Sequence, residues 1–207
     1  AGRTVEVRQP RQRAVLAALA VDAGRPVPIE TLIDRVWSDV APRRVRQTLY
    51  TYISQLRNVL GAAVDEPATA AVLVRRSGGY LLDVAADRVD IHRFRRLVER
   101  ARQDTCTPPQ RVTALREALD LWRGTPLADL PGTWPERVRS GWGNEYLAAV
   151  DAWARAEVQV GQAERAIGRL AAVVADHPLN ESLAATLMHV LHAAGRGADA
   201  LGVYARV

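Results

Sequence analysis

The stretch RRVRQTLYTYISQLRNVL, residues 43–60, indicates most directly how this chain folds. Apolar side chains recur in it every three or four residues from Val45, which is the spacing of a helix with one buried stripe. The apolar positions are Val45, Leu49, Tyr52, Ile53, Leu56, Val59 and Leu60. The opposite face is polar and contains no acidic residue. The pattern predicts an amphipathic helix whose polar face suits a negatively charged partner.

A hairpin with a basic tip is predicted shortly after this helix. The sequence VLVRRSGGYLL, residues 72–82, has apolar residues on both sides of an Arg-Arg-Ser-Gly-Gly turn. A helix followed by such a hairpin is the winged-helix arrangement. In that arrangement the helix fits the major groove of DNA, and the hairpin tip reaches a minor groove or the phosphates.

The segments around this pair complete the same domain. The expected elements are a strand end at Thr4–Val7, a helix at Ala14–Val21 closed by Gly24, an extended piece framed by Pro26 and Pro28, a helix from Pro28 to Trp37, and loops at residues 38–42 and 62–71. The predicted order is therefore strand, helix, strand, helix, helix, hairpin.

Beyond Asp90 the apolar periodicity is wholly helical, apart from a loop rich in Gly and Pro at residues 124–133. The last part repeats itself at 34 residues, for example at Gly161 and Gly195 and at Ala166 and Ala200. A helix-turn-helix period of 34 is typical of tetratricopeptide repeats. We therefore predict a mainly α fold with a small β component. A winged helix-turn-helix domain at residues 1–88 is followed by an all-α, tetratricopeptide-like domain at residues 89–207.

The composition supports a folded protein with a basic first half. Residues 40–80 hold six arginines and two acids, whereas residues 95–207 hold 14 arginines and 13 acids. A solvated charged surface is the alternative explanation of this asymmetry. No membrane span or signal peptide is visible, and the one cysteine, Cys106, cannot form an internal disulfide. We expect a cytoplasmic, nucleoid-associated protein.

Ten polar residues of the helix and hairpin are the predicted DNA contacts. Gln47, Thr51 and Ser54 are placed at base edges, because glutamine and hydroxyl side chains can read them. Arginine and asparagine side chains are placed near phosphates or guanines, and the tip arginines near phosphates or in a minor groove. The full set is Arg43, Arg44, Gln47, Tyr50, Thr51, Ser54, Arg57, Asn58, Arg75 and Arg76. Tyr80 is expected to pack against the hairpin, and the five tryptophans to pack in cores or between domains.

Together these segments resemble the Streptomyces antibiotic regulatory protein (SARP) family, which joins an OmpR-type winged helix to a bacterial transcriptional activation domain. The resemblance covers nearly the whole chain. It is carried by Arg13–Leu19 with Gly24, Leu32–Trp37, Leu49–Leu60, Gly79 with Tyr80, ALDLWRGTP (118–126), HPLNESL (177–183) and Leu187–Tyr204. Members of the family usually have further strands before the position of Arg3 and further helices after Val207, so both ends are expected to be truncated.

The resemblance implies a transcriptional activator. Its partners would be double-stranded promoter DNA with short direct repeats, a second copy of the chain on that DNA, and RNA polymerase holoenzyme. The loop residues Ser38, Asp39, Val40 and Ala41 would contact the sigma factor, the alpha C-terminal domain or the beta flap. The regulated genes would be those of antibiotic or other secondary-metabolite synthesis.

Other functional classes find less support in the sequence. All 28 basic residues are arginine, which excludes a P-loop, Schiff-base or kinase-type lysine within the chain. His189 and His192 lie one helical turn apart without a third ligand nearby in sequence. We expect no catalytic residue, metal, cofactor or membrane partner. The alternatives are a tetratricopeptide signalling scaffold, or the regulatory front of a larger regulator that contains an ATPase.

Overall fold

The computed structural model describes residues 6–38, 40–62 and 71–205. Two compact units divide the chain. The first contains residues 1–93 and 125–140, and the second contains residues 94–124 and 141–207. The mainly α fold with a small β component is as predicted. The single domain boundary expected after residue 88 stays a prediction. The two packing units interleave along the chain, so they do not define one boundary between domains.

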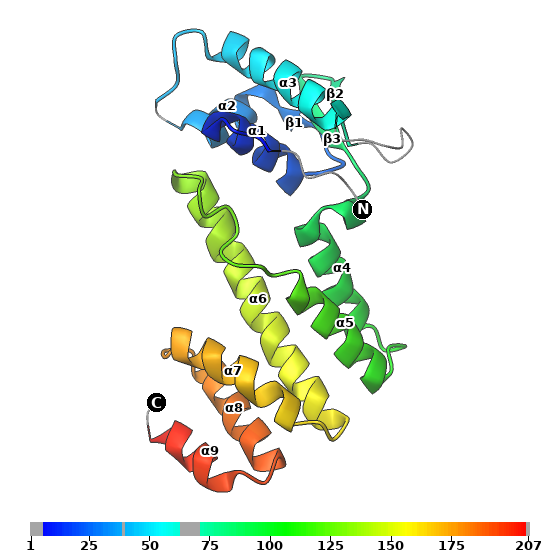
Figure 1. Ribbon diagram of the computed structural model, residues 1–207, viewed down its shortest axis with the longest axis vertical. Coiled ribbons are helices and arrows are strands. Elements are labelled where there is room, and N and C mark those ends of the chain that lie inside the picture. Colours follow the sequence, from blue (N-terminus) through cyan, green and yellow to red (C-terminus); the bar gives the residue numbers. More distant parts are fainter. Residues whose placement is uncertain (1–5, 39, 63–70, 206–207) are drawn as a thin grey trace. The chain divides into compact units, whose positions relative to one another are not determined.

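Besides the first residues of two later helices, the described part of the first unit contains three complete α-helices (Figure 1). They are α1 (Pro10–Val21), α2 (Ile29–Trp37) and α3 (Val45–Ala62). α2 follows Pro28 and α3 bears the apolar stripe, both as predicted. α1 begins at Pro10 instead of Ala14, because a proline in the first turn has a suitable φ and lacks only a hydrogen-bond donor that the helix does not use there.

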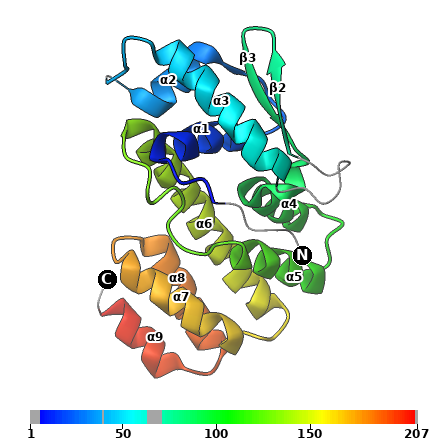
Figure 2. The same cartoon turned by 45° about the horizontal axis from the view of Figure 1, so that its top comes forward.

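A three-stranded antiparallel sheet completes the winged helix, in the order β1-β3-β2. The strands are β1 (Val27–Pro28), β2 (Val72–Arg76) and β3 (Gly79–Asp83). Figure 2 shows β2 and β3 side by side as the predicted hairpin. A Cβ on Gly79 would lie 2.1 Å from the carbonyl oxygen of Val27, so only glycine fits where β3 meets β1.

Two expected segments, the first strand and the loop after α3, fall partly outside the described residues. Glu6 and Val7 belong to no strand, so the strand expected at Thr4–Val7 is absent from its described half. Thr4, Val5 and most of the loop expected at residues 62–71 lie outside the described residues.

The core of the first unit lies between its three helices and the sheet. Leu19, Leu32, Leu49 and Leu56 are completely buried in it. These residues come from α1, α2 and α3, and they occupy the apolar stripe of each helix. The polar face of α3 is consequently turned away from the core.

The second unit is all-helical within the described residues. Its elements are most of α4 (Asp90–Arg102), α5 (Pro108–Asp120), the larger part of α6 (Thr133–Gln159), α7 (Glu164–Asp176), α8 (Glu181–Ala193) and α9 (Gly197–Tyr204). A short 3₁₀ turn, Ala86–Arg88, precedes α4. Between α4 and α6, Glu145 raises the pKa of the Arg95 guanidinium, mainly by accepting its hydrogen bond.

The 34-residue repeat is confirmed at the level of the backbone. α6 and α8 each end two residues before a glycine with positive φ, 72° at Gly161 and 76° at Gly195. The next amide then donates back across the helix end, from Gln162 to the carbonyl of Glu157 and from Arg196 to that of Leu191, at 2.8 Å in both cases. These are two copies of one glycine-dependent helix stop.

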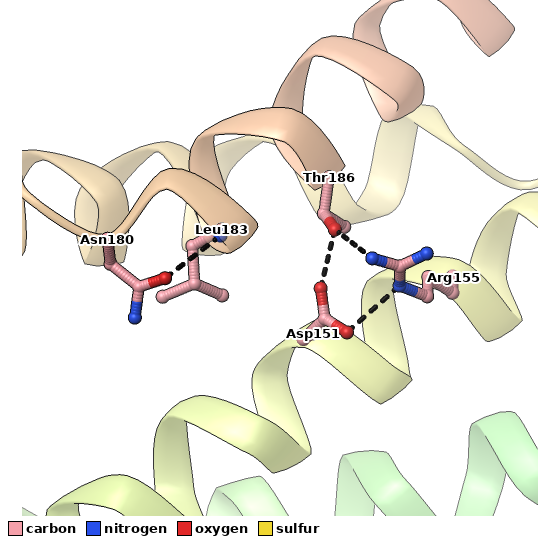
Figure 3. A network of polar contacts seen from close by, with 5 residues as sticks. All are labelled: Asp151, Arg155, Asn180, Leu183 and Thr186. Carbon is pink, nitrogen blue, oxygen red and sulfur yellow. Dashed lines mark hydrogen bonds and ion pairs between the residues drawn. The ribbon is translucent and has the colours of Figure 1, made fainter. Parts of the chain in front are cut away.

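Side chains join α6 and α8. Thr186 donates its hydroxyl hydrogen to Asp151, and Arg155 donates to both of these residues (Figure 3). Asn180 caps α8 by accepting from the amide of Leu183 at 3.1 Å. The two helices that begin the successive repeats are thus packed against each other, as in tetratricopeptide proteins.

Candidate nucleic-acid interface

The polar face of α3 is exposed along its whole length. All of its predicted contact residues are solvent-exposed, namely Gln47, Tyr50, Thr51, Ser54, Arg57 and Asn58. Arg43 and Arg44, also exposed, form the turn immediately before the helix. Since Leu49, Ile53 and Leu56 are buried on the other side, rotation of the helix is fixed by the core. The structure therefore brings these predicted residues to one surface.

The hydroxyl of Thr51 is anchored to its own helix. Its Oγ1 donates to the carbonyl of Gln47 at 3.1 Å, as Oγ1 of Thr48 donates to that of Arg44 at 3.2 Å. Such a bond uses the hydroxyl hydrogen and leaves the oxygen able to accept. The exposed Thr51 side chain consequently presents an acceptor and a methyl group in a fixed orientation.

The hairpin tip carries two exposed arginines. Arg75 is paired in register with Tyr80, and Arg76 with Gly79, directly before the turn at Ser77 and Gly78. Neither guanidinium forms an ion pair with any residue that the structure describes. Both positive charges remain available to an external anion.

Arg57 connects the helix to the hairpin. Its Nε donates to the carbonyl of Leu73 at 2.8 Å, and its guanidinium carbon lies 5.8 Å from the centre of the Tyr80 ring. Tyr80 is buried and also meets Tyr50 edge-on at 6.4 Å. Tyr80 was expected to pack against the hairpin, and it is indeed buried, but its described ring contacts come from α3. Arg57 has a structural contact that its sequence position did not indicate.

Arg46 belongs to the same surface, although it was not among the predicted contacts. It lines an open hollow on α3 together with Gln47, Tyr50, Thr51 and Ser54. It also forms a 2.5 Å ion pair with Glu30 of α2. Because Arg46 lies next to Gln47 on the helix, the sequence could have indicated its place on this surface. The pairing with Glu30 needs the tertiary fold.

The loop after α2 projects apolar surface. Ser38 has a positive φ of 48°, and its amide donates to the carbonyl of Asp34 at 2.8 Å, which closes the helix. Val40 is 77% exposed, and Ala41 is exposed as well. Asp39, the remaining candidate for a polymerase contact, lies outside the described residues.

None of the helices in the described ranges is long and apolar enough to cross a membrane. Within that same part of the chain, no three His, Cys, Asp or Glu side chains are grouped so that they could hold a metal ion. Four of the tryptophans are buried, as expected for core residues, and Trp122 is partly buried between Phe94 and Tyr146.

Two known domain families match the chain. Residues 3–82 match the family described as transcriptional regulatory protein, C terminal. Residues 89–207 match the bacterial transcriptional activator domain. The two matches follow one another in the order expected from the sequence.

Regulatory proteins of known name are similar to the chain over almost all of its length. The chain is 36% identical to the regulatory protein AfsR of Streptomyces coelicolor over 99% of its own length, which is 20% of AfsR. It is 35% identical to the regulatory protein DnrI of Streptomyces peucetius over 97% of its length and 75% of DnrI. It is 33% identical to the transcriptional regulatory protein EmbR of Mycobacterium tuberculosis, of which it spans 53%.

A solved structure agrees with these relatives. Mycobacterium tuberculosis EmbR, in complex with a low affinity phosphopeptide, superposes on 98% of this chain and 54% of EmbR, with a TM-score of 0.83 and 32% identity. Since both domain families and a relative matched over most of its length agree, the chain belongs to the Streptomyces antibiotic regulatory protein (SARP) family of transcriptional regulators.

Proposed function

We propose that this chain is a sequence-specific DNA-binding transcriptional activator. One observation carries the proposal: an exposed helix face without an acidic residue lies next to two tip arginines that are free of ion pairs within the described residues. Both features suit a phosphate backbone. In this proposal residues 1–88 read the DNA and residues 89–207 activate transcription, in accordance with the two family matches.

The helix is assigned to the major groove. Gln47, Thr51 and Ser54 would contact base edges, where each well-placed side chain contributes about 1–3 kcal/mol of discrimination. Arg43 and Arg44, in the turn before α3, would bind phosphates or guanine. Asn58 would bind the backbone near the other end of the helix, and Tyr50 would border the contact.

The hairpin is assigned to the flanking DNA. Arg75 and Arg76 would neutralise phosphates or enter a narrow minor groove, which attracts arginine. Arg57 is proposed to act in two ways, by holding the hairpin against α3 and by adding positive charge close to the backbone. The distance between helix and hairpin contacts would then be set within the protein before it meets DNA.

Activation is proposed to need two further partners. Two copies would bind direct repeats spaced about one helical turn apart, in a head-to-tail arrangement. Ser38 to Ala41 and the exposed face of the helical domain would recruit RNA polymerase holoenzyme through the sigma factor, the alpha C-terminal domain or the beta flap. The family suggests promoters of antibiotic or secondary-metabolite genes, and hence a place in the cytoplasm at the nucleoid.

A footprint combined with transcription in vitro tests this function. The chain is added to DNA from its own genomic neighbourhood, first with DNase and then with polymerase from an actinobacterium. We expect protection of repeated short sites and more transcript from the same promoter. Protection without added transcript would refute activation. A folded protein without any protected site would favour the tetratricopeptide scaffold.

A further inference from the structure

The first unit includes a segment that the sequence assigns to the second domain. We call residues 125–140 the strap. Two of its side chains, Leu130 and Trp134, are only 3% and 7% exposed, and they belong to the same buried cluster as the core of α1, α2 and α3. Leu127 and Val138 pack against that cluster as well. The strap therefore completes the core of the DNA-reading unit.

Polar contacts give the strap a defined shape. Arg139 donates to the carbonyl of Leu127 at 2.8 Å and to that of Leu130 at 3.1 Å, which folds the strap's loop back onto its helix. Asp129 forms an ion pair with Arg13 of α1 at 2.8 Å. The carbonyl of Leu127 also accepts from the amide of Leu130 at 3.0 Å. Since one guanidinium binds both carbonyls, loss of Arg139 would loosen the loop without removing an apolar side chain.

The strap meets the end of α2, where the loop with Val40 begins. The guanidinium of Arg35 lies over the Trp134 ring, 5.3 Å from its centre. A Cβ on Gly132 would lie 3.7 Å from Oγ of Ser38, so the backbone of the strap passes next to the first residue of that loop. On its other side this helix end is held by Trp37, which stacks on Tyr52 of α3.

We infer that Trp134 is a positioning residue: the strap holds the end of α2 so that Ser38, Val40 and Ala41 are presented to polymerase in one conformation. This inference rests on the proposed function. If the strap is released, Ser38, Val40 and Ala41 have to be ordered when polymerase binds. The apparent affinity for polymerase is then reduced to the fraction of molecules in which they already have the competent conformation. Among the described residues, no hydrogen bond, ion pair or ring contact joins the polar face of α3 to the strap, so DNA binding is expected to persist.

Three variants and a matched control separate this role from simple core filling. Arg139→Ala removes the two strap hydrogen bonds, and Trp134→Ala removes the ring under Arg35. Arg137→Ala is the control, because Arg137 is exposed on the same helix and forms no hydrogen bond or ion pair with the described residues. Trp134→Phe retains an aromatic ring in the site. For each protein, circular dichroism, DNA affinity and polymerase-dependent transcript are measured, the last at DNA-saturating concentration.

We expect the DNA affinity of Arg139→Ala to lie within about twofold of that of Arg137→Ala. At limiting polymerase, however, Arg139→Ala should yield on the order of 10-fold less transcript, because two hydrogen bonds that hold the strap are lost. Higher polymerase concentration should restore the transcript. Trp134→Phe should retain most of the activity that Trp134→Ala loses. If Trp134→Ala fails to fold, Arg139→Ala decides. Normal activation by folded Arg139→Ala would overturn the inference, whereas a wild-type chain that does not bind DNA would instead refute the proposed function.

Discussion

The tip arginines permit a quantitative prediction about binding to DNA. In the double variant Arg75→Ala/Arg76→Ala, both side chains are removed from β2, while the backbone register with β3 can be retained. Both residues are exposed and form no ion pair with the described residues, so their loss should leave the fold intact. Any change in DNA affinity should then come from lost phosphate contacts.

The magnitude follows from counterion release. Each phosphate contact contributes about 0.9 to the slope of log affinity against log salt, so two contacts contribute about 1.8. Between 50 and 200 mM salt, the wild-type chain should therefore lose about 12-fold more affinity than the double variant. Fluorescence anisotropy with one labelled duplex at four or five salt concentrations measures both slopes.

A charge-matched control is available in the second unit. Arg123 and Arg165 are exposed and make no ion pair in the part of the chain that the structure describes. Their double alanine variant removes the same net charge, and it should retain the wild-type slope. Equal slopes for all three proteins, or an equally large change in the control, would refute the placement of the hairpin on DNA.

Three further substitutions test the contacts that hold the fold together. In Gly79→Ala the added Cβ would clash with a backbone carbonyl of β1, so the substitution should lower the free energy of unfolding, measured by urea denaturation, by about 3 kcal/mol. An unchanged denaturation midpoint would contradict the close approach of β3 to β1. Arg116→Ala leaves the fully buried Glu157 without its 2.6 Å ion pair. Because Arg116 is itself 42% exposed, we expect the free energy of unfolding to fall by only about 1–3 kcal/mol, and an unchanged value would show that the fold does not need this ion pair. Arg57→Ala should raise hydrogen exchange in β2, and unaltered exchange would rule out its role as a tie to the hairpin.

Local sequence patterns were sufficient for α3, the hairpin and the repeat. In α3 the apolar spacing alone identifies Leu49, Ile53 and Leu56 as buried, because a helix repeats every 3.6 residues whatever surrounds it. Gly161 and Gly195 likewise show their role through their 34-residue separation. The exposure of the predicted contact face follows directly from the burial of the opposite stripe.

The strap could not be predicted in this way. Leu130 lies in a loop rich in Gly and Pro, and Trp134 in the first turn of α6, so neither has a periodic context that indicates its partner. Their contacts join residues about one hundred positions apart, and such contacts leave no trace in local spacing. On the candidate DNA-binding surface, the hydrogen bond between Arg57 and Leu73 and the ion pair between Arg46 and Glu30 could not be predicted for the same reason, since both join separate elements of the fold.

The base preference of the chain is the most direct test of the central proposal, that α3 reads base edges. Bound duplexes are selected from random DNA with the wild-type chain and with Gln47→Ala, and the preferred bases are compared position by position. We predict that the variant selects a site of the same length but loses preference at one position, since one good base contact discriminates by about 1–3 kcal/mol. Identical preferences at every position, for Gln47→Ala and equally for Thr51→Ala, would contradict the assignment of this face to DNA.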